Sequence, residues 1–296
     1  MYNNQDKVTL KKIAEVTGYS INTVSRALRG KNDIKVETRN YIKKVANDYG
    51  YVENSIAQSM RLGYTKTISV ILGDISNPHF SILMKEIEIA LSKEGYSVFL
   101  LNTNEDEENE FSAIQTAINK SVDGIIICPT QKSKKNCEYL KKIGIPFILI
   151  GRYFKDLDTS YCICDDFKGG YLATKRLLEL GHRRILILTG PDYISSAYER
   201  FMGYKKALAE YKVPLDQNLV MKVPLQCSGE CDYSSILNKD FTAIFAFSDI
   251  IAWDVWNFLN SNGKRIPDDI SIIGFDHILS RLSLPLSLAS ISSFLY

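Results

Sequence analysis

The stretch Thr9–Gly30, TLKKIAEVTGYSINTVSRALRG, predicts two short helices joined by a tight turn. The first helix has apolar or small residues at the i, i+3, i+4, i+7 spacing of one buried face, namely Leu10, Ile13, Ala14 and Thr17. Gly18 then supplies a residue that tolerates positive φ at the corner. Ser20 is placed to cap the second helix, because its hydroxyl can accept a hydrogen bond from the amide of Thr23.

The second helix predicts a surface that reads DNA. Its inward stripe is Val24, Ala27 and Leu28, which leaves Ile21 and several polar side chains on the opposite face. Arginine can bond guanine and asparagine can bond adenine in the major groove, so we expect Ile21, Asn22 and Arg26 at base edges and Arg29 at phosphate. The predicted DNA-contacting residues of this region are Thr9, Ser20, Ile21, Asn22, Thr23, Ser25, Arg26 and Arg29. A solvated amphipathic hairpin is the other interpretation of the same pattern.

Charge is divided unevenly along the chain. Residues 1–64 hold eleven Lys/Arg and six Asp/Glu, whereas residues 65–296 hold 25 and 28. A small basic end on a slightly acidic body fits a head that binds a polyanion, because Lys and Arg release counterions from phosphates. A solvated basic face is the alternative.

Composition and motifs exclude several other classes of protein. With 45% hydrophobic and 24% charged residues, the 296-residue chain is typical of a soluble globular protein of two or more domains. The start lacks a signal peptide and no apolar run reaches about 18 residues, so we expect a cytoplasmic protein without a membrane partner. The six cysteines lack disulfide-framework or zinc spacing, which favours reduced, mostly buried thiols and no metal. Without dinucleotide, phosphate-loop or GxSxG motifs, we predict a binding protein that is no enzyme and needs no cofactor.

From Thr67 onward, short apolar runs alternate with amphipathic helices. TISVILG (67–73) and YSVFLLN (96–102) open a first half, and the strand YCICDD (161–166) is expected to open a second. Continuous Val/Ile/Leu/Phe runs of this length are typical of parallel strands covered on both faces. The pattern predicts two doubly wound subdomains with a cleft at the carboxyl ends of their strands.

The N-terminal stretch resembles the headpiece of the lactose/galactose-repressor (LacI/GalR) family of bacterial transcription regulators. The resemblance rests on TVSRAL (23–28) and the closing GYVEN (50–54), whose order and spacing agree with the family. It implies a helix-turn-helix headpiece over residues 1–53 that binds a pseudo-palindromic operator in double-stranded DNA as a homodimer.

The same resemblance implies a hinge segment over residues 54–64. In the family this segment becomes a helix in the minor groove, so Asn54 would cap it, Ala57 would be its small residue, and Met60 would be the wedge at the central base step. Met60 and Glu53 stand where the family usually has leucine and proline. A plain flexible linker is the alternative.

The rest of the chain resembles the periplasmic-sugar-binding-like core of the same family. The landmarks are DISNPHF (74–80), CDDFKGG (164–170), LGHRRI (180–185), ERFMGYKKAL (199–208), AFSD (246–249) and IIGFD (272–276). Carried over by motif, the effector-binding residues would be Asn77, Phe80, Asp165, Arg200, Ser248 and Asp276. Phe80 would form an apolar wall, Arg200 would donate to sugar hydroxyls and Asp276 would accept from them. Phe80 as plain core, and Arg200 with Asp276 as a structural ion pair, are the alternatives.

The C-terminal end departs from the family pattern. After IIGFD the family normally has a loop, a strand and then returning elements, whereas here LSLPLSLASISSFLY (282–296) reaches only the loop and strand. We therefore expect a core over 65–296 that is truncated at the C-terminus and less stable, with an N-subdomain of about 65–163, a C-subdomain of about 164–288 and an incomplete third crossover.

Together these features predict a transcription regulator, most simply a repressor, whose operator affinity is changed by a small-molecule effector such as a sugar. One alternative is a DNA-binding remnant with a non-functional effector core. Another is a stand-alone sugar-binding module, which would have no use for the basic head.

Overall fold

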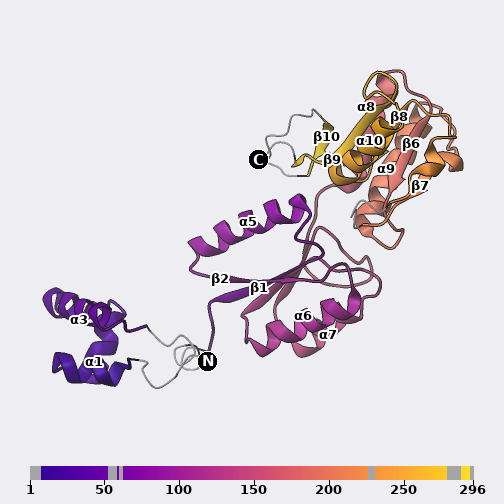
Figure 1. Ribbon diagram of the computed structural model, residues 1–296. Coiled ribbons are helices and arrows are strands. Elements are labelled where there is room, and N and C mark those ends of the chain that lie inside the picture. Colours follow the sequence, from indigo (N-terminus) through magenta and orange to yellow (C-terminus); the bar gives the residue numbers. More distant parts are fainter. Residues whose placement is uncertain (1–7, 53–58, 60–62, 226–230, 279–287, 294–296) are drawn as a thin grey trace. The chain divides into compact units, whose positions relative to one another are not determined.

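The computed structural model describes residues 8–52, 59, 63–225, 231–278 and 288–293 (Figure 1). Contacts between Cα atoms divide the chain into two units, residues 1–65 and residues 66–296. Within the described residues, no helix has the length and apolar character that crossing a membrane requires.

The first unit is a three-helix headpiece of α1 (Leu10–Thr17), α2 (Ile21–Leu28) and α3 (Val36–Asp48). Thr9 Oγ1 caps α1 by accepting from the Lys12 amide at 3.2 Å, and α1 ends at Gly18 with φ of 75°. Ser20 Oγ caps α2 by accepting from the Thr23 amide at 3.1 Å, as expected from the sequence. The three helices enclose a small core of Ile13, Ala14, Val24, Ala27 and Ile42.

The second unit opens with a parallel five-stranded sheet in the order β2-β1-β3-β4-β5. Its strands are β1 (Thr67–Leu72), β2 (Ser97–Asn102), β3 (Gly124–Ile127), β4 (Phe147–Ile150) and β5 (Tyr161–Cys162). Figure 1 shows α5 (Pro78–Lys93) over one face and α6 (Glu107–Asn119) with α7 (Lys135–Ile143) over the other. Because both faces are covered, the middle strands are apolar on both sides.

A second parallel sheet follows in the order β10-β9-β8-β6-β7. Its strands are β6 (Ile185–Thr189), β7 (Val220–Lys222), β8 (Ala243–Ala246), β9 (Ser271–Asp276) and β10 (Ala289–Ser292). Side chains of α8 (Asp166–Glu179) and α9 (Ser195–Glu210) share one core cluster with this sheet, and those of α10 (Asp249–Ser261) share another. Two short 3-10 helices flank β7 in the sequence: η2 (Gln217–Leu219) precedes it, and η3 (Ser234–Ile236) lies between β7 and β8.

Three expectations need correction, and one strand was missed. The segment YCICDD does not open the second half, because only Tyr161 and Cys162 form a strand, and β5 pairs with β4 at the edge of the first sheet. Thiols are less buried than predicted, since only Cys128 and Cys137 of the five described cysteines are buried and Cys162 is exposed. Strand β7 was not predicted, whereas β10, paired with β9, is the strand that the sequence predicts after IIGFD. The helical spacing of Ile42, Val45, Ala46 and Tyr49 predicts one inward face for a third helix, but Tyr49 is 46% exposed and lies outside that face. Tyr51 packs on the headpiece core in its place.

Glycines bring α8 and α9 into close contact. A Cβ built on Gly170 would lie 2.2 Å from the carbonyl oxygen of Arg200, and one on Gly203 would lie 2.1 Å from that of Phe167. Only glycine allows two helix backbones to approach this closely. The crossing sets Arg200 of α9 against the first turn of α8, at the carboxyl end of the second sheet.

Candidate DNA-reading surface and effector cleft

The outward face of α2 is accessible for contact with a partner. Ile21 is 49% exposed at the start of the helix, and Asn22 beside it is also exposed. Both follow Ser20, whose cap fixes the direction of the first turn. An apolar and an amide side chain are therefore held at the end of a helix that is short enough to enter a major groove.

The two arginines of α2 already have partners in the headpiece. Arg26 Nε donates to Asp33 Oδ2 at 2.9 Å, and the two side chains form an exposed ion pair. Arg29 Nε donates to the Ser25 carbonyl oxygen at 3.0 Å, and Arg29 Nη2 donates to Ser25 Oγ. The exposed Arg26–Asp33 ion pair is weak and exchanges readily for phosphate or base atoms.

Several predicted DNA-contacting residues form helix caps in this structure. Thr9 and Ser20 are N-caps, and Ser20 Oγ also lies 2.9 Å from Thr23 Oγ1. The three hinge predictions, Asn54, Ala57 and Met60, lie outside the described residues.

In the second unit, Arg200 is the centre of a buried cluster of charges. Its Nε donates to Asp166 Oδ1 at 2.8 Å, its Nη1 donates to the Phe247 carbonyl oxygen, and its Nη2 lies 3.8 Å from Asp276 Oδ1. The guanidinium also lies 3.5 Å from the centre of the Phe275 ring. The side chain is therefore fixed on several sides at the carboxyl end of the second sheet.

Asp276 closes this cluster at the end of β9. The residue is 4% exposed, and burial raises the pKa of Asp276 to about 7 although the Arg200 cation opposes the shift. From the first subdomain, His79 Nδ1 approaches Asp276 Oδ1 to 3.7 Å, which is too long for a hydrogen bond. Burial lowers the pKa of His79 to about 4, and the Arg200 cation adds to this, so the imidazole is neutral at pH 7.

The other predicted effector residues have mainly structural contacts. Asn77, Asp165 and Ser248 cap α5, α8 and α10, accepting from the amides of His79, Lys168 and Ile251 at 3.0, 2.9 and 3.3 Å. Phe80 is 9% exposed and packs with Val70, Leu72 and Cys128 beneath the first sheet. Arg200 and Asp276 are thus the predicted pair that the structure brings together.

Sequence reasoning missed the neighbours of two of these residues. Asp166, and not Asp165, is the buried carboxylate on Arg200, and His79, and not Phe80, approaches Asp276 from the first subdomain. Arg152 was also missed. It is buried at the end of β4, where Nη1 and Nη2 each donate to Glu105 at 2.7 Å. A GR pair directly after a predicted buried strand was the available signal for Arg152.

A second set of contacts joins the two subdomains. Gln131 Oε1 accepts from the Ser195 amide at 2.9 Å and so caps α9, whose own N-cap residue Ile194 provides no side-chain bond. Tyr153 donates its amide to Ser195 Oγ at 3.1 Å and its hydroxyl to Glu199 Oε1 at 3.0 Å. One end of α9 is therefore held by residues of the first subdomain.

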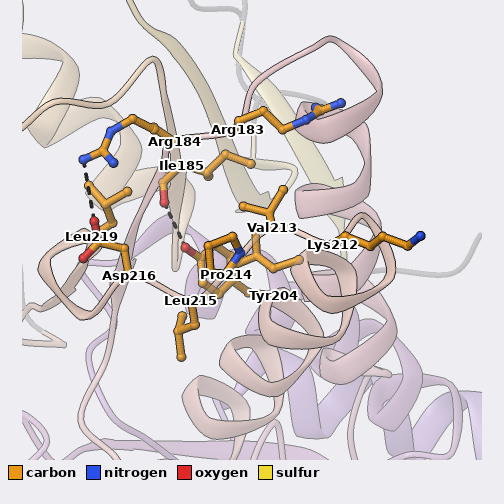
Figure 2. A pocket seen from close by; sticks show the side chains of 11 residues that line it. Arg183, Arg184, Ile185, Tyr204, Lys212, Val213, Pro214, Leu215, Asp216 and Leu219 are labelled. Carbon is orange, nitrogen blue, oxygen red and sulfur yellow. Dashed lines mark hydrogen bonds and ion pairs between the residues drawn. The ribbon is translucent and has the colours of Figure 1, made fainter.

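The described residues of the second unit include the linings of two hollows. One, of about 370 Å³, is lined by Tyr153, Ile163, Cys164, Asp165, Asp166, Phe167 and Glu199, next to the charge cluster. The other, of about 610 Å³, lies at the amino end of β6 (Figure 2). Figure 2 shows Arg184 turned to Asp216, and Arg183 and Lys212 extending outward. Ligands of parallel α/β sheets bind at the carboxyl ends of strands, so the smaller hollow is the candidate effector cleft.

A helix-turn-helix unit followed by two parallel α/β subdomains, with buried charges where their strands end, defines the class of DNA-binding regulators with a ligand-binding core. Residues 9–54 match the family described as "Bacterial regulatory proteins, lacI family", and residues 65–290 match "Periplasmic binding proteins and sugar binding domain of LacI family". The chain belongs to the LacI family, whose members are transcriptional regulators and not enzymes.

The HTH-type transcriptional regulator DegA of Bacillus subtilis (strain 168) and the ribose operon repressor of Haemophilus influenzae are similar proteins. Each is 32% identical over 285 residues, which span 94% of this chain and 85% of the relative. A solved LacI family regulator from Enterococcus faecium with bound ribose is 33% identical, with a TM-score of 0.67 over 76% of this chain and 83% of that one.

Proposed function

We propose that this protein is a homodimeric transcription repressor that binds a pseudo-palindromic operator and releases or tightens it when a sugar enters the core. The exposed, capped start of α2 is the observation that carries the DNA-binding part. Two copies of α2, one from each subunit, would each read one half-site. Such a regulator acts where the chromosome is, in the bacterial cytoplasm.

Within each half-site, Ile21, Asn22 and Arg26 contact base edges. The guanidinium of Arg26 exchanges its exposed ion pair with Asp33 for guanine O6 and N7. Arg29 and the other basic residues of the headpiece hold phosphate. Asn54, Ala57 and Met60 belong to the hinge segment that completes the contact in the minor groove.

The proposed effector site lies at the carboxyl ends of the strands, where His79 of the first subdomain approaches Asp276 of the second, beside Arg200 and Asp166. Support comes from Arg200 and Asp276, a donor and an acceptor of the kind that sugar hydroxyls need. Ribose is the first candidate, because it is bound in a 33% identical relative and names the operon of another at 32%.

Duplex binding to an operator taken from upstream of the gene tests this function. Affinity should fall steeply with salt, and ribose or another sugar should change it by a coupling of about 1–3 kcal/mol. Arg26→Ala should cost about 1–3 kcal/mol and relax specificity at one base pair, whereas Lys206→Ala on the core should leave operator binding unchanged. Equal affinity for operator and random duplex would refute the proposal.

A further inference from the structure

We infer that the effector of this protein carries no phosphate or carboxylate group, and that the buried acids around Arg200, Asp276 foremost, exclude such groups. The inference rests on the effector site proposed above. The site would bind a hydroxyl-rich, non-anionic molecule in preference to the corresponding phosphate ester.

The first ground is the balance of buried charge. Among the described residues, two buried carboxyl groups, those of Asp166 and Asp276, face the buried Arg200 cation. A charged group is expensive to bury without an opposite charge, and an added anion would find this cation already shared between two acids. The site is therefore unfavourable for phosphate.

The second ground is that both buried arginines are already bound to carboxylates. Arg152 has a forked pair of hydrogen bonds to Glu105, which is the geometry that a phosphate would otherwise take. Arg200 donates to Asp166 and to the Phe247 carbonyl oxygen, and faces Asp276 with its remaining nitrogen. An anionic ligand would have to displace a buried carboxylate and leave it unpaired.

The third ground is that the helix N-termini at this edge are capped. Asparagine, aspartate and serine side chains cap α5, α8 and α10, and Gln131 from the opposite subdomain caps α9. Helix N-termini are the usual backbone sites for phosphate, since their free amides point at the ligand. Here the side-chain oxygens of the protein occupy that position.

What the site does offer is acceptors for hydroxyl groups. Among the described residues, the nitrogen atoms nearest to the Asp276 carboxyl group, His79 Nδ1 and Arg200 Nη2, lie at 3.7 and 3.8 Å, beyond hydrogen-bond distance. A sugar hydroxyl can donate to it and accept from Arg200 Nη2 in the same place. The site thus matches a molecule that both donates and accepts, and not one that only accepts.

Isothermal titration calorimetry on the full chain tests the inference with matched pairs: ribose and ribose 5-phosphate, glucose and glucose 6-phosphate, galactose and galactose 6-phosphate. Inorganic phosphate serves as the minimal anionic probe. We expect a parent sugar to bind, its phosphate ester to bind at least about a hundredfold more weakly, and inorganic phosphate to show no saturable binding.

Asp276→Asn, measured at pH 8 and so above the pKa of about 7 of Asp276, then tests whether its charge is responsible. It should weaken the parent sugar but reduce the preference over the ester by about tenfold. Asp268→Asn, which removes an exposed carboxylate just before β9, should leave that preference unchanged. An unaltered preference in Asp276→Asn would overturn the role given to Asp276.

An ester that binds as tightly as its parent, or phosphate binding that Arg200→Ala abolishes, would overturn the inference. The proposed function would survive that result if the ester changed operator affinity. Failure of every sugar and ester to bind would overturn the inference and the sugar part of the proposed function together. Operator binding would still report on the regulator itself.

Discussion

Gly203→Ala is the most informative single change in the core, because it acts on the helix crossing that places Arg200. The new Cβ would lie 2.1 Å from the Phe167 carbonyl oxygen and 2.5 Å from the Tyr171 amide nitrogen, whereas ordinary contact begins at 3.4 Å. Both atoms are backbone and cannot rotate away. The helices α8 and α9 must separate by about 1 Å to accept the methyl group.

That separation has a calculable consequence for the charge cluster. Arg200 Nε to Asp166 Oδ1 is 2.8 Å, and adding about 1 Å takes the pair beyond hydrogen-bond distance. Breaking a buried ion pair costs about 3–5 kcal/mol, and alanine recovers about 1 kcal/mol of helix propensity. We therefore expect a net loss of about 2–4 kcal/mol of stability, together with loss of sugar binding.

Urea unfolding followed by tryptophan fluorescence measures this loss where it arises. Both tryptophans, Trp253 and Trp256, lie in α10 of the same subdomain as Gly203. Ala209→Gly, at an exposed position of the same helix, is the matched control and should cost only about 1 kcal/mol of propensity while sugar binding persists. A Gly203→Ala protein that is as stable as the parent and binds sugar equally would refute the close-crossing argument.

Three further changes test other parts of the molecule. Ser20→Ala removes the cap of α2 and should destabilise the headpiece by about 1 kcal/mol, seen as a lower helical melting temperature of residues 1–65; no change would mean that water replaces the hydroxyl. Between about pH 4 and 7 the folded parent keeps a proton on Asp276 that the unfolded chain has lost, so the parent loses stability as pH rises. Asp276→Asn lacks this loss and should gain on the order of 3 kcal/mol relative to the parent from pH 5 to pH 8. Urea unfolding at the two pH values measures the difference, and a constant difference would contradict the argument. Gln131→Ala should cost about 1 kcal/mol through the lost cap of α9, and an unchanged urea midpoint would show that the Ser195 amide needs no partner from the other subdomain.

Local signals were enough to predict the headpiece. The Gly18 corner and the Ser20 cap depend on residues no more than four positions apart, so the sequence contains all the information that fixes them. Tyr49 was misplaced because it follows the end of α3, where the helical period that predicted its face no longer applies.

The effector cluster depends on contacts between residues that lie far apart in the sequence, which local hydrophobic periodicity does not predict. Asp165 and Asp166 are adjacent and chemically equivalent, and the choice between them is made by α9, which comes close only through Gly170 and Gly203. His79 has its role because the end of β9 lies opposite α5. The edge strand β5 was assigned to the wrong sheet because strand pairing is a long-range property that composition does not encode.

Helix α9 is the element through which ligand and subdomain position can be coupled. Its first amide is capped by Gln131 from the opposite subdomain, and one turn later Glu199 binds the Tyr153 hydroxyl. Arg200 follows directly and faces Asp276, the acceptor proposed for the sugar. A ligand that bonds Arg200 and Asp276 therefore acts on the same helix turn that joins the two subdomains. A small shift of that turn changes the bonds between the subdomains and the bonds to the ligand together. Ligand binding and subdomain position can therefore be coupled by about 1–3 kcal/mol.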